Sequence, residues 1–126
     1  MLKYGPQTEA IKTILTKIKN STSEQVERLN ASRDTADYAT YTVARYDAHH
    51  AICDAAEYAA WDTVRFAAYH AVLDAARYAA WDTVRDASYH TIRDAAWDAV
   101  LAIITKDKIS QKTFDILYGP WGSVMD

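Results

Sequence analysis

Apolar side chains recur at helical spacing near the start of the chain. Ile11, Ile14, Leu15 and Ile18 follow Pro6, and proline is acceptable in the first turn of a helix. The pattern predicts a short amphipathic helix in this segment.

A second short helix is expected after the polar run at residues 20–23. Ser21 and Glu24 have the spacing of a capping box, in which two side chains satisfy two backbone N–H groups at a helix start. Val26 and Leu29 supply the apolar positions of this helix.

The other end of the chain predicts one more brief helix. Ser110 is a good N-cap residue, and Phe114 and Leu117 follow it at helical spacing. We expect residues 118–120, which contain glycine and proline, to end this helix and residues 121–126 to be irregular.

Between these ends lies a 20-residue internal repeat. Residues 59–78 (AAWDTVRFAAYHAVLDAARY) align without gaps on residues 79–98 (AAWDTVRDASYHTIRDAAWD), with 13 of 20 positions identical. Residues 39–58 match the middle unit at 9 of 20 positions, and residues 34–38 resemble the end of an earlier copy. Agreement of this extent indicates duplication.

The composition of the repeat favours helix. Alanine supplies 21 of the 71 residues at 34–104, and this segment contains neither glycine nor proline. Alanine has the highest helix propensity, whereas strands favour β-branched and aromatic residues. We therefore predict a single all-α domain over residues 1–126: N-terminal helices in 1–33, an array of helices from the repeat in 34–104, and a C-terminal helix and tail in 105–126.

Two arrangements of the array fit the pattern. Twenty residues turn a straight helix by about 200°, so successive units of one long helix would face opposite ways. Either short helices restart near Asp34, Asp54, Asp74 and Asp94, or long helices bury alternating faces between neighbours. We favour the first because aspartate suits helix starts better than helix interiors.

Charge and cysteine content limit the classes of function and the cellular location that fit the sequence. The net charge is +3 over residues 1–33, −6 over 34–104 and zero over 105–126. An acidic array disfavours direct DNA or RNA binding and suits a basic partner surface. With one cysteine, no signal-peptide pattern and no apolar run long enough to span a membrane, we expect a soluble, cytoplasmic protein.

The repeat places tryptophan and arginine four residues apart on a helix. Trp61 precedes Arg65, and Trp81 precedes Arg85, at the spacing that lets a guanidinium stack on an indole. Such a pair could bind a nucleotide, because the base can stack on the indole and the phosphate can pair with the guanidinium. The same residues also suit a core tryptophan beside an intrahelical salt bridge, and the sequence leaves both interpretations open.

Histidine and tyrosine recur in the same units. Tyr69 and His70, and again Tyr89 and His90, complete the candidate binding residues, because tyrosine is frequent at interfaces. Each of these histidines lies four residues before an aspartate, which could orient an imidazole as a general base. Repetition argues against catalysis, since an active site needs one asymmetric arrangement.

The chain lacks the familiar motifs of enzymes and metal sites. With three glycines it has no phosphate-binding loop, and it has no zinc-protease or nucleophile-elbow motif. His49, His50, Cys53 and Asp54 lie close together, but this spacing without a second pair is a weak metal signal. We predict no catalytic residue, metal or cofactor.

The pattern D-A-A-x-Y-A-A-W-D-T-V-R, at residues 54–65 with a close copy at 74–85, resembles helical proteins of bacteriophages and bacteria that are rich in Ala, Trp, Asp and Arg, some described as immunity proteins. The resemblance covers residues 34–104. It implies a phage-like or mobile-element protein that acts by binding, for instance by neutralising a host defence or a toxin. It specifies neither a ligand nor functional residues.

Three functions fit these observations. The first is a non-catalytic inhibitor that binds a host protein through an exposed acidic and aromatic face. The second is a sponge for a small nucleotide signal, which requires a concave pocket where aromatic rings and arginines converge. The third is a structural homo-oligomer.

Overall fold

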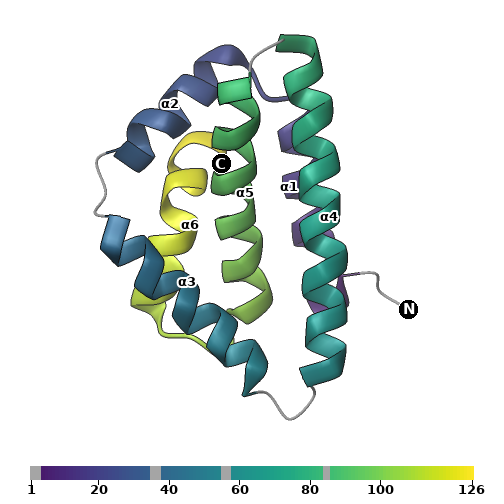
Figure 1. The fold of residues 1–126 in the computed structure, drawn as a ribbon, viewed down its shortest axis with the longest axis vertical. Helices are drawn as coiled ribbons and strands as arrows, with labels where there is room; N and C mark the ends of the chain where they lie inside the picture. The colour runs from purple at the N-terminus through teal and green to yellow at the C-terminus, as the bar shows by residue number, and fades with distance from the viewer. Residues whose placement is uncertain (1–3, 35–37, 55–57, 84–85) are drawn as a thin grey trace.

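The computed structural model of the chain describes residues 4–34, 38–54, 58–83 and 86–126 (Figure 1). The side chains of residues 33, 34, 38, 58, 80–83 and 86–88 are also outside this description. Within the described ranges the chain forms only helices, so the all-α prediction is confirmed. The elements are η1 (Gly5–Gln7), α1 (Thr8–Lys19), α2 (Ser23–Asp34), α3 (Tyr38–Cys53), α4 (Tyr58–Thr83), α5 (Asp86–Thr105) and α6 (Gln111–Met125).

Helix α5 lies at the centre of the fold. It contacts each of the other α-helices: α4 and α1 lie on one side, and α2, α3 and α6 on the other (Figure 1). Every residue from 98 to 105 is buried. Val100, Leu101, Ile103 and Ile104 point in different directions around the helix and are all buried, so the core surrounds the C-terminal half of α5.

The repeat units do not fold as equivalent helices. Asp74 lies in the interior of α4 and Asp94 in the interior of α5, so the prediction that these residues start helices is wrong. Asp34 ends α2, and Asp54 follows α3 with its N–H bonded to the carbonyl of His50 at 2.9 Å. α4 is instead one long helix, because its alanine-rich sequence contains no helix breaker and its alanines pack into the core.

The start of α2 uses a capping box one residue later than predicted. The N–H of Thr22 donates to Oε1 of Gln25 at 2.9 Å, and the N–H of Gln25 donates to Oγ1 of Thr22 at 3.1 Å. Ser21 instead donates its hydroxyl to the carbonyl of Ile18 at the end of α1. The prediction of a capping box is therefore right, but the pair of residues predicted to form it is wrong.

Helix α6 begins as predicted but is much longer. The N–H of Thr113 donates to Oγ of Ser110 at 3.1 Å, which confirms the N-cap. The helix then continues through Pro120 to Met125, so the prediction that it ends at residues 118–120 is wrong. Leu117, Trp121 and Met125 lie four residues apart and are all buried, and this burial offsets the backbone hydrogen bond that proline cannot donate.

Mutation can test the different roles of Ser110, which caps a helix, and Asp74, which lies inside one. Ser110→Ala is expected to lower the free energy of unfolding by about 1 kcal/mol, because the Thr113 N–H loses its acceptor. Asp74→Ala is expected to change it by less than about 0.5 kcal/mol, because Asp74 is an exposed residue inside a helix. Chemical denaturation followed by circular dichroism measures both values. Equal losses in the two variants would contradict this assignment of the caps.

Candidate functional site

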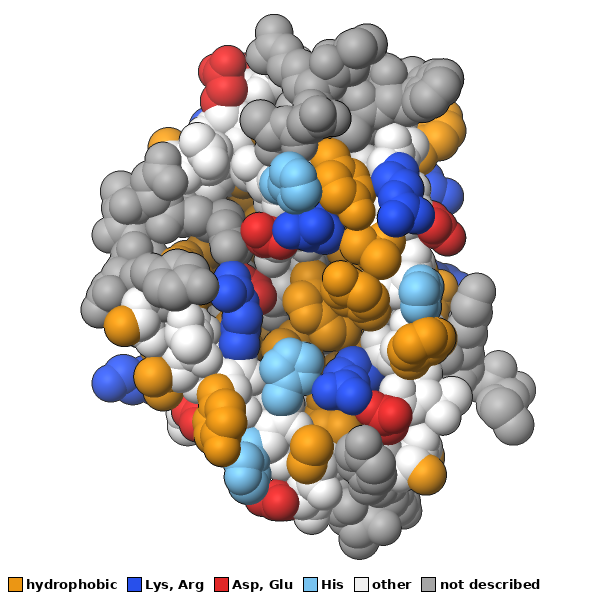
Figure 2. All heavy atoms as spheres, viewed as in Figure 1, with side chains coloured by type: hydrophobic (Ala, Val, Ile, Leu, Met, Phe, Trp, Pro, Cys, Tyr) orange, Lys and Arg blue, Asp and Glu red, His pale blue; other side chains and the backbone are white. Residues whose placement is uncertain are grey.

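Helices α3, α4 and α5 surround a hollow on the face of the molecule seen in Figure 2. Apolar surface lies in its middle, and basic, histidine and acidic side chains surround it (Figure 2). Its volume is about 340 Å³, within the size range of small-molecule sites. We call it the central pocket, and it is lined by Arg45 from α3, Tyr69 from α4, and Arg93, Asp94, Trp97 and Asp98 from α5.

Helical spacing explains why these side chains meet. Residues three or four apart share one face of a helix. Arg45 and His49 therefore lie on one face of α3, as do Arg65 and Tyr69 on α4. The helices approach closely because buried alanines, such as Ala48 beside this face of α3, occupy little space between them.

A bidentate salt bridge joins α3 to α5 at the bottom of the pocket. Nε of Arg45 donates to Oδ1 of Asp98 at 2.8 Å, and Nη2 donates to Oδ2 at 2.9 Å. The side chain of Asp98 is 2% exposed and that of Arg45 is 29% exposed. Removing a carboxylate from water costs several kcal/mol, so this pair adds little net stability and mainly fixes where the guanidinium lies.

Another arginine, Arg65 of α4, lies next to the pocket. Nη1 of Arg65 lies 3.1 Å from Nδ1 of His49, and its Nη2 pairs with the carboxylate of Asp62. A guanidinium can only donate, so Nδ1 of His49 must accept, and its proton must reside on Nε2. The contact fixes the tautomer of His49.

The environment of His49 keeps its imidazole neutral. Burial lowers its pKa from the ordinary value near 6.5, and the charges of Arg65 and Arg45 lower it further, against the opposing effect of Asp98. Because the folded pKa lies below the unfolded one, His49 favours folding above pH 6.5 and this contribution is lost as pH falls below that value. The positive charge of the pocket therefore comes from arginine.

Aromatic rings form the apolar part of the pocket. The rings of Tyr69 and Trp97 meet edge to face, with centroids 5.0 Å apart at 75°. The ring of His49 lies 6.5 Å from that of Trp97. On the α5 side, Nε of Arg93 donates to Oδ1 of Asp94 at 2.9 Å, and its guanidinium lies 5.4 Å from the ring centre of Tyr89. The pocket is thus lined by two arginines, Arg45 and Arg93, and by two aromatic rings, those of Tyr69 and Trp97.

The residues proposed from sequence are divided between several places. Tyr69 lines the central pocket, and Arg65 lies beside it in contact with His49. Trp61 packs on the core, with Nζ of Lys108 5.1 Å from its ring centre, whereas Arg65 turns to His49 and Asp62. His70 lines a separate groove between α1 and α4.

The remaining proposed residues belong to the last repeat unit. Tyr89 packs on the core under Arg93, and its ring lies 5.2 Å from that of the exposed His90. The side chains of Trp81 and Arg85 lie outside the described part of the chain.

Five residues that line the pocket were not predicted as binding residues: Arg45, Arg93, Asp94, Trp97 and Asp98. The neighbouring His49 was considered only as a metal ligand. Arg45 and His49 carried a signal, because Arg45 stands 20 residues before Arg65 and His49 stands 20 before Tyr69, at equivalent positions of the repeat. Asp98 carried another signal, since it is an acid inside an apolar run and a buried acid requires a partner.

The cluster of possible metal ligands at the end of α3 does not converge on one point. His49 turns to Arg65, while Nδ1 of His50 lies 2.7 Å from Oδ2 of Asp54. Across the described residues, no three His, Cys, Asp or Glu side chains are placed to hold one metal ion. The helices within those residues also include none with the length and apolar character needed to cross a bilayer.

No protein-family model matches the chain, and comparisons with curated proteins and with solved structures likewise give no match. The likeness to phage and bacterial proteins therefore stays a prediction. Function has to be argued from the site itself.

Proposed function

We propose that this protein is a non-catalytic binding protein that holds a small nucleotide, with a planar base and an anionic phosphate, in the central pocket. One observation carries the proposal: the rings of Trp97 and Tyr69 lie in one pocket with the guanidinium groups of Arg45 and Arg93. Aromatic rings stack on nucleobases, and guanidinium groups recognise phosphate.

The ion pairs of the pocket support a rigid site. Asp98 holds Arg45, Asp62 holds Arg65, and Asp94 holds Arg93. Side chains that are already fixed lose less freedom when a ligand binds. The acids also balance the arginine charge, which favours a ligand with one phosphate, such as a nucleoside monophosphate or a cyclic mononucleotide, over a polyphosphate.

The pocket favours binding over chemistry. The residues that line it in the described structure include no serine, threonine or cysteine that could act as a nucleophile. His49, the histidine next to it, has its Nδ1 turned to Arg65. In this proposal the protein sequesters its ligand unchanged in the cytoplasm, and the resemblance to phage proteins suggests a host nucleotide signal as that ligand.

A second function, binding a host protein, rests on a different observation. Among the described residues the large exposed apolar side chains are Val43, Tyr46, Phe66, Tyr69 and Tyr78. They are spread over α3 and α4 and do not form one pocket, so we place this function second.

Calorimetric titration tests the proposed function. The probes are the ribonucleoside 5′-monophosphates and the corresponding 3′,5′-cyclic monophosphates. We expect at least one to bind, and Trp97→Ala to weaken that binding by at least about tenfold, or 1.4 kcal/mol, because one stacked base is worth about 1–3 kcal/mol. Chromatography after prolonged incubation is expected to recover the nucleotide intact.

Trp61→Ala is the matched control, because it removes the same side chain from a place outside the pocket. It is expected to leave the affinity within about twofold. Absence of binding to every probe at millimolar concentration, or equal losses in the two tryptophan variants, would overturn the proposal.

A further inference from the structure

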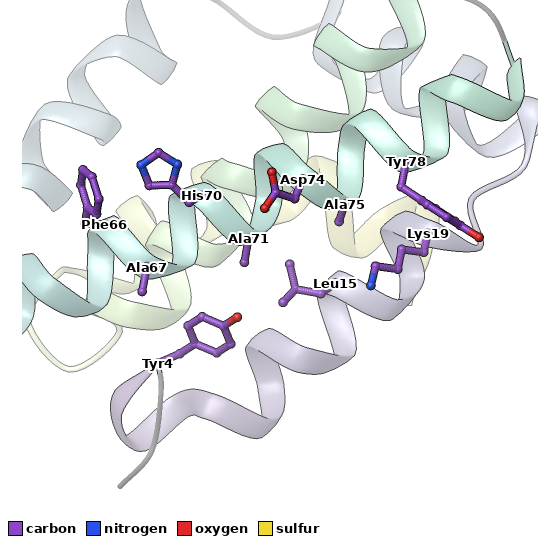
Figure 3. Close-up of a pocket in the computed structure, with 10 residues that line it drawn as sticks. All are labelled: Tyr4, Leu15, Lys19, Phe66, Ala67, His70, Ala71, Asp74, Ala75 and Tyr78. Atoms are coloured by element: carbon purple, nitrogen blue, oxygen red, sulfur yellow. The ribbon is translucent and has the colours of Figure 1, made fainter.

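A groove runs between α1 and α4 (Figure 3). Its volume is about 570 Å³. Ala67, Ala71 and Ala75 lie along α4 toward the groove, and Leu15 of α1 faces them (Figure 3). Ala75 is buried, but Ala67 and Ala71 are small and only partly buried, so another helix could approach α4 closely beside them.

One edge of this groove is a row of larger side chains on α4, which we call the α4 ridge: Phe66, His70, Asp74 and Tyr78 (Figure 3). Its members lie four residues apart and form one ridge along the helix, which turns by about 40° from each member to the next. Phe66 is 66% exposed and Tyr78 is 59% exposed, and both are large aromatic side chains of the kind enriched at interfaces.

The order of residues along the α4 ridge is self-complementary. A two-fold axis beside Val72 would set a second α4 antiparallel to the first, with each residue opposite the one equally far from Val72 on the other side. Phe66 would then face Tyr78 of the second copy, and His70 would face Asp74 of the second copy. The two-fold axis repeats each pair, so the dimer would contain two contacts between aromatic rings and two contacts between an imidazole and a carboxylate.

We propose that the protein forms a homodimer through the α4 ridge, with the ridge of each copy lying in the α1–α4 groove of the other. Two-fold symmetry requires one surface to complement itself, and this row of side chains meets that requirement. In the commonest class of helix packing, rows of residues four apart on one helix pack between the equivalent rows on the other. A parallel arrangement would instead set Asp74 against Asp74.

Charge complementarity favours a second copy over an unrelated partner. Asp74 has Arg77 as a neighbour at 3.8 Å, a loose and exposed pair that leaves its carboxylate able to turn toward another cation. His70 is fixed from one side by Phe66, whose ring lies 4.4 Å away at 62°. The dimer contacts do not use Trp97 or Arg45 of the central pocket, which belong to α5 and α3. Tyr69 of that pocket lies next to His70 on α4, with ring centroids 6.0 Å apart.

Light scattering coupled to size exclusion, over a concentration series of the full chain, tests the dimer. We expect the wild type to reach twice the monomer mass. His70→Asp sets two carboxylates against each other at each end of the pairing and is expected to raise the dissociation constant at least tenfold. The double variant H70D/D74H restores opposite partners, and its dissociation constant is expected to return to within about threefold of wild type.

Tyr46→Ala is the control, because Tyr46 is as exposed as Phe66 but lies on α3. It is expected to leave the dimer unchanged, whereas Phe66→Ala weakens it. Circular dichroism checks that every variant is folded. A wild type that stays monomeric at millimolar concentration, a double variant no better than His70→Asp, or a dimer broken only by Tyr46→Ala would each overturn the proposal. Trp97→Ala is expected to dimerise normally, which separates this result from the nucleotide test.

Discussion

Replacing Trp121 with alanine is expected to lower the free energy of unfolding by about 3–5 kcal/mol, the usual loss for a large aromatic side chain in a core. Trp121 is fully buried in α6, between the buried residues Leu117 and Met125. A loss of this size is a large part of the total stability of a small domain. Urea denaturation measures it, and a loss below about 1 kcal/mol would show that the last turns of α6 are not part of the core.

Trp121→Phe is the matched variant. The buried Nε1 of Trp121 has no hydrogen-bond partner among the described residues, and an unsatisfied buried donor costs about 1–3 kcal/mol. Phenylalanine removes that donor while it retains most of the apolar volume. We therefore expect Trp121→Phe to cost much less than Trp121→Ala.

Removing the carboxylate of Asp98 is expected to be the second large effect, about 3 kcal/mol for Asp98→Ala. The guanidinium of Arg45 would remain at the bottom of the central pocket without its bidentate partner. The value lies at the lower end of the range for broken buried pairs, because Arg45 is still 29% exposed and water can reach it.

Two further variants separate charge pairing from simple loss of packing. Asp94→Ala breaks a more exposed pair with Arg93 in the same pocket and is expected to cost less than about 1 kcal/mol. Replacing both members of the buried pair, as R45M/D98L, is expected to recover most of the stability, because no buried charge is then left alone. If the double variant were as unstable as Asp98→Ala, the pair would be stabilising in its own right.

The fold could be predicted from sequence where local signals decide the structure. The absence of helix breakers over residues 34–104 and the Ser110 cap both led to the right local structure. The interior position of Asp74 could not be read locally, because burial of the alanines of α4 outweighs the preference of aspartate for a helix start. The continuation of α6 through Pro120 likewise depends on the burial of Trp121, which only the packed fold reveals.

The candidate site was predictable only in part. Tyr69 and the neighbouring Arg65 were proposed from sequence because large or charged side chains recur at these positions of an otherwise alanine-rich repeat. Trp97 escaped notice because its repeat equivalents are Arg77 and Glu57, so the pocket combines different positions of different units. Which faces of α3, α4 and α5 meet depends on how the helices pack, and the repeat period carries no information about that.

The central place of α5 also has a consequence for synthesis of the chain on the ribosome. Within the described parts of the chain, α1, α2, α3 and α4 are made before α5, and all of them pack against it. The 20 residues of α5 take about 1–4 s to translate at 5–20 residues per second. During that interval the apolar faces of the earlier helices lack the surface that covers them, so the nascent chain is expected to be most sensitive to aggregation, and most dependent on chaperones, just before residue 105 emerges.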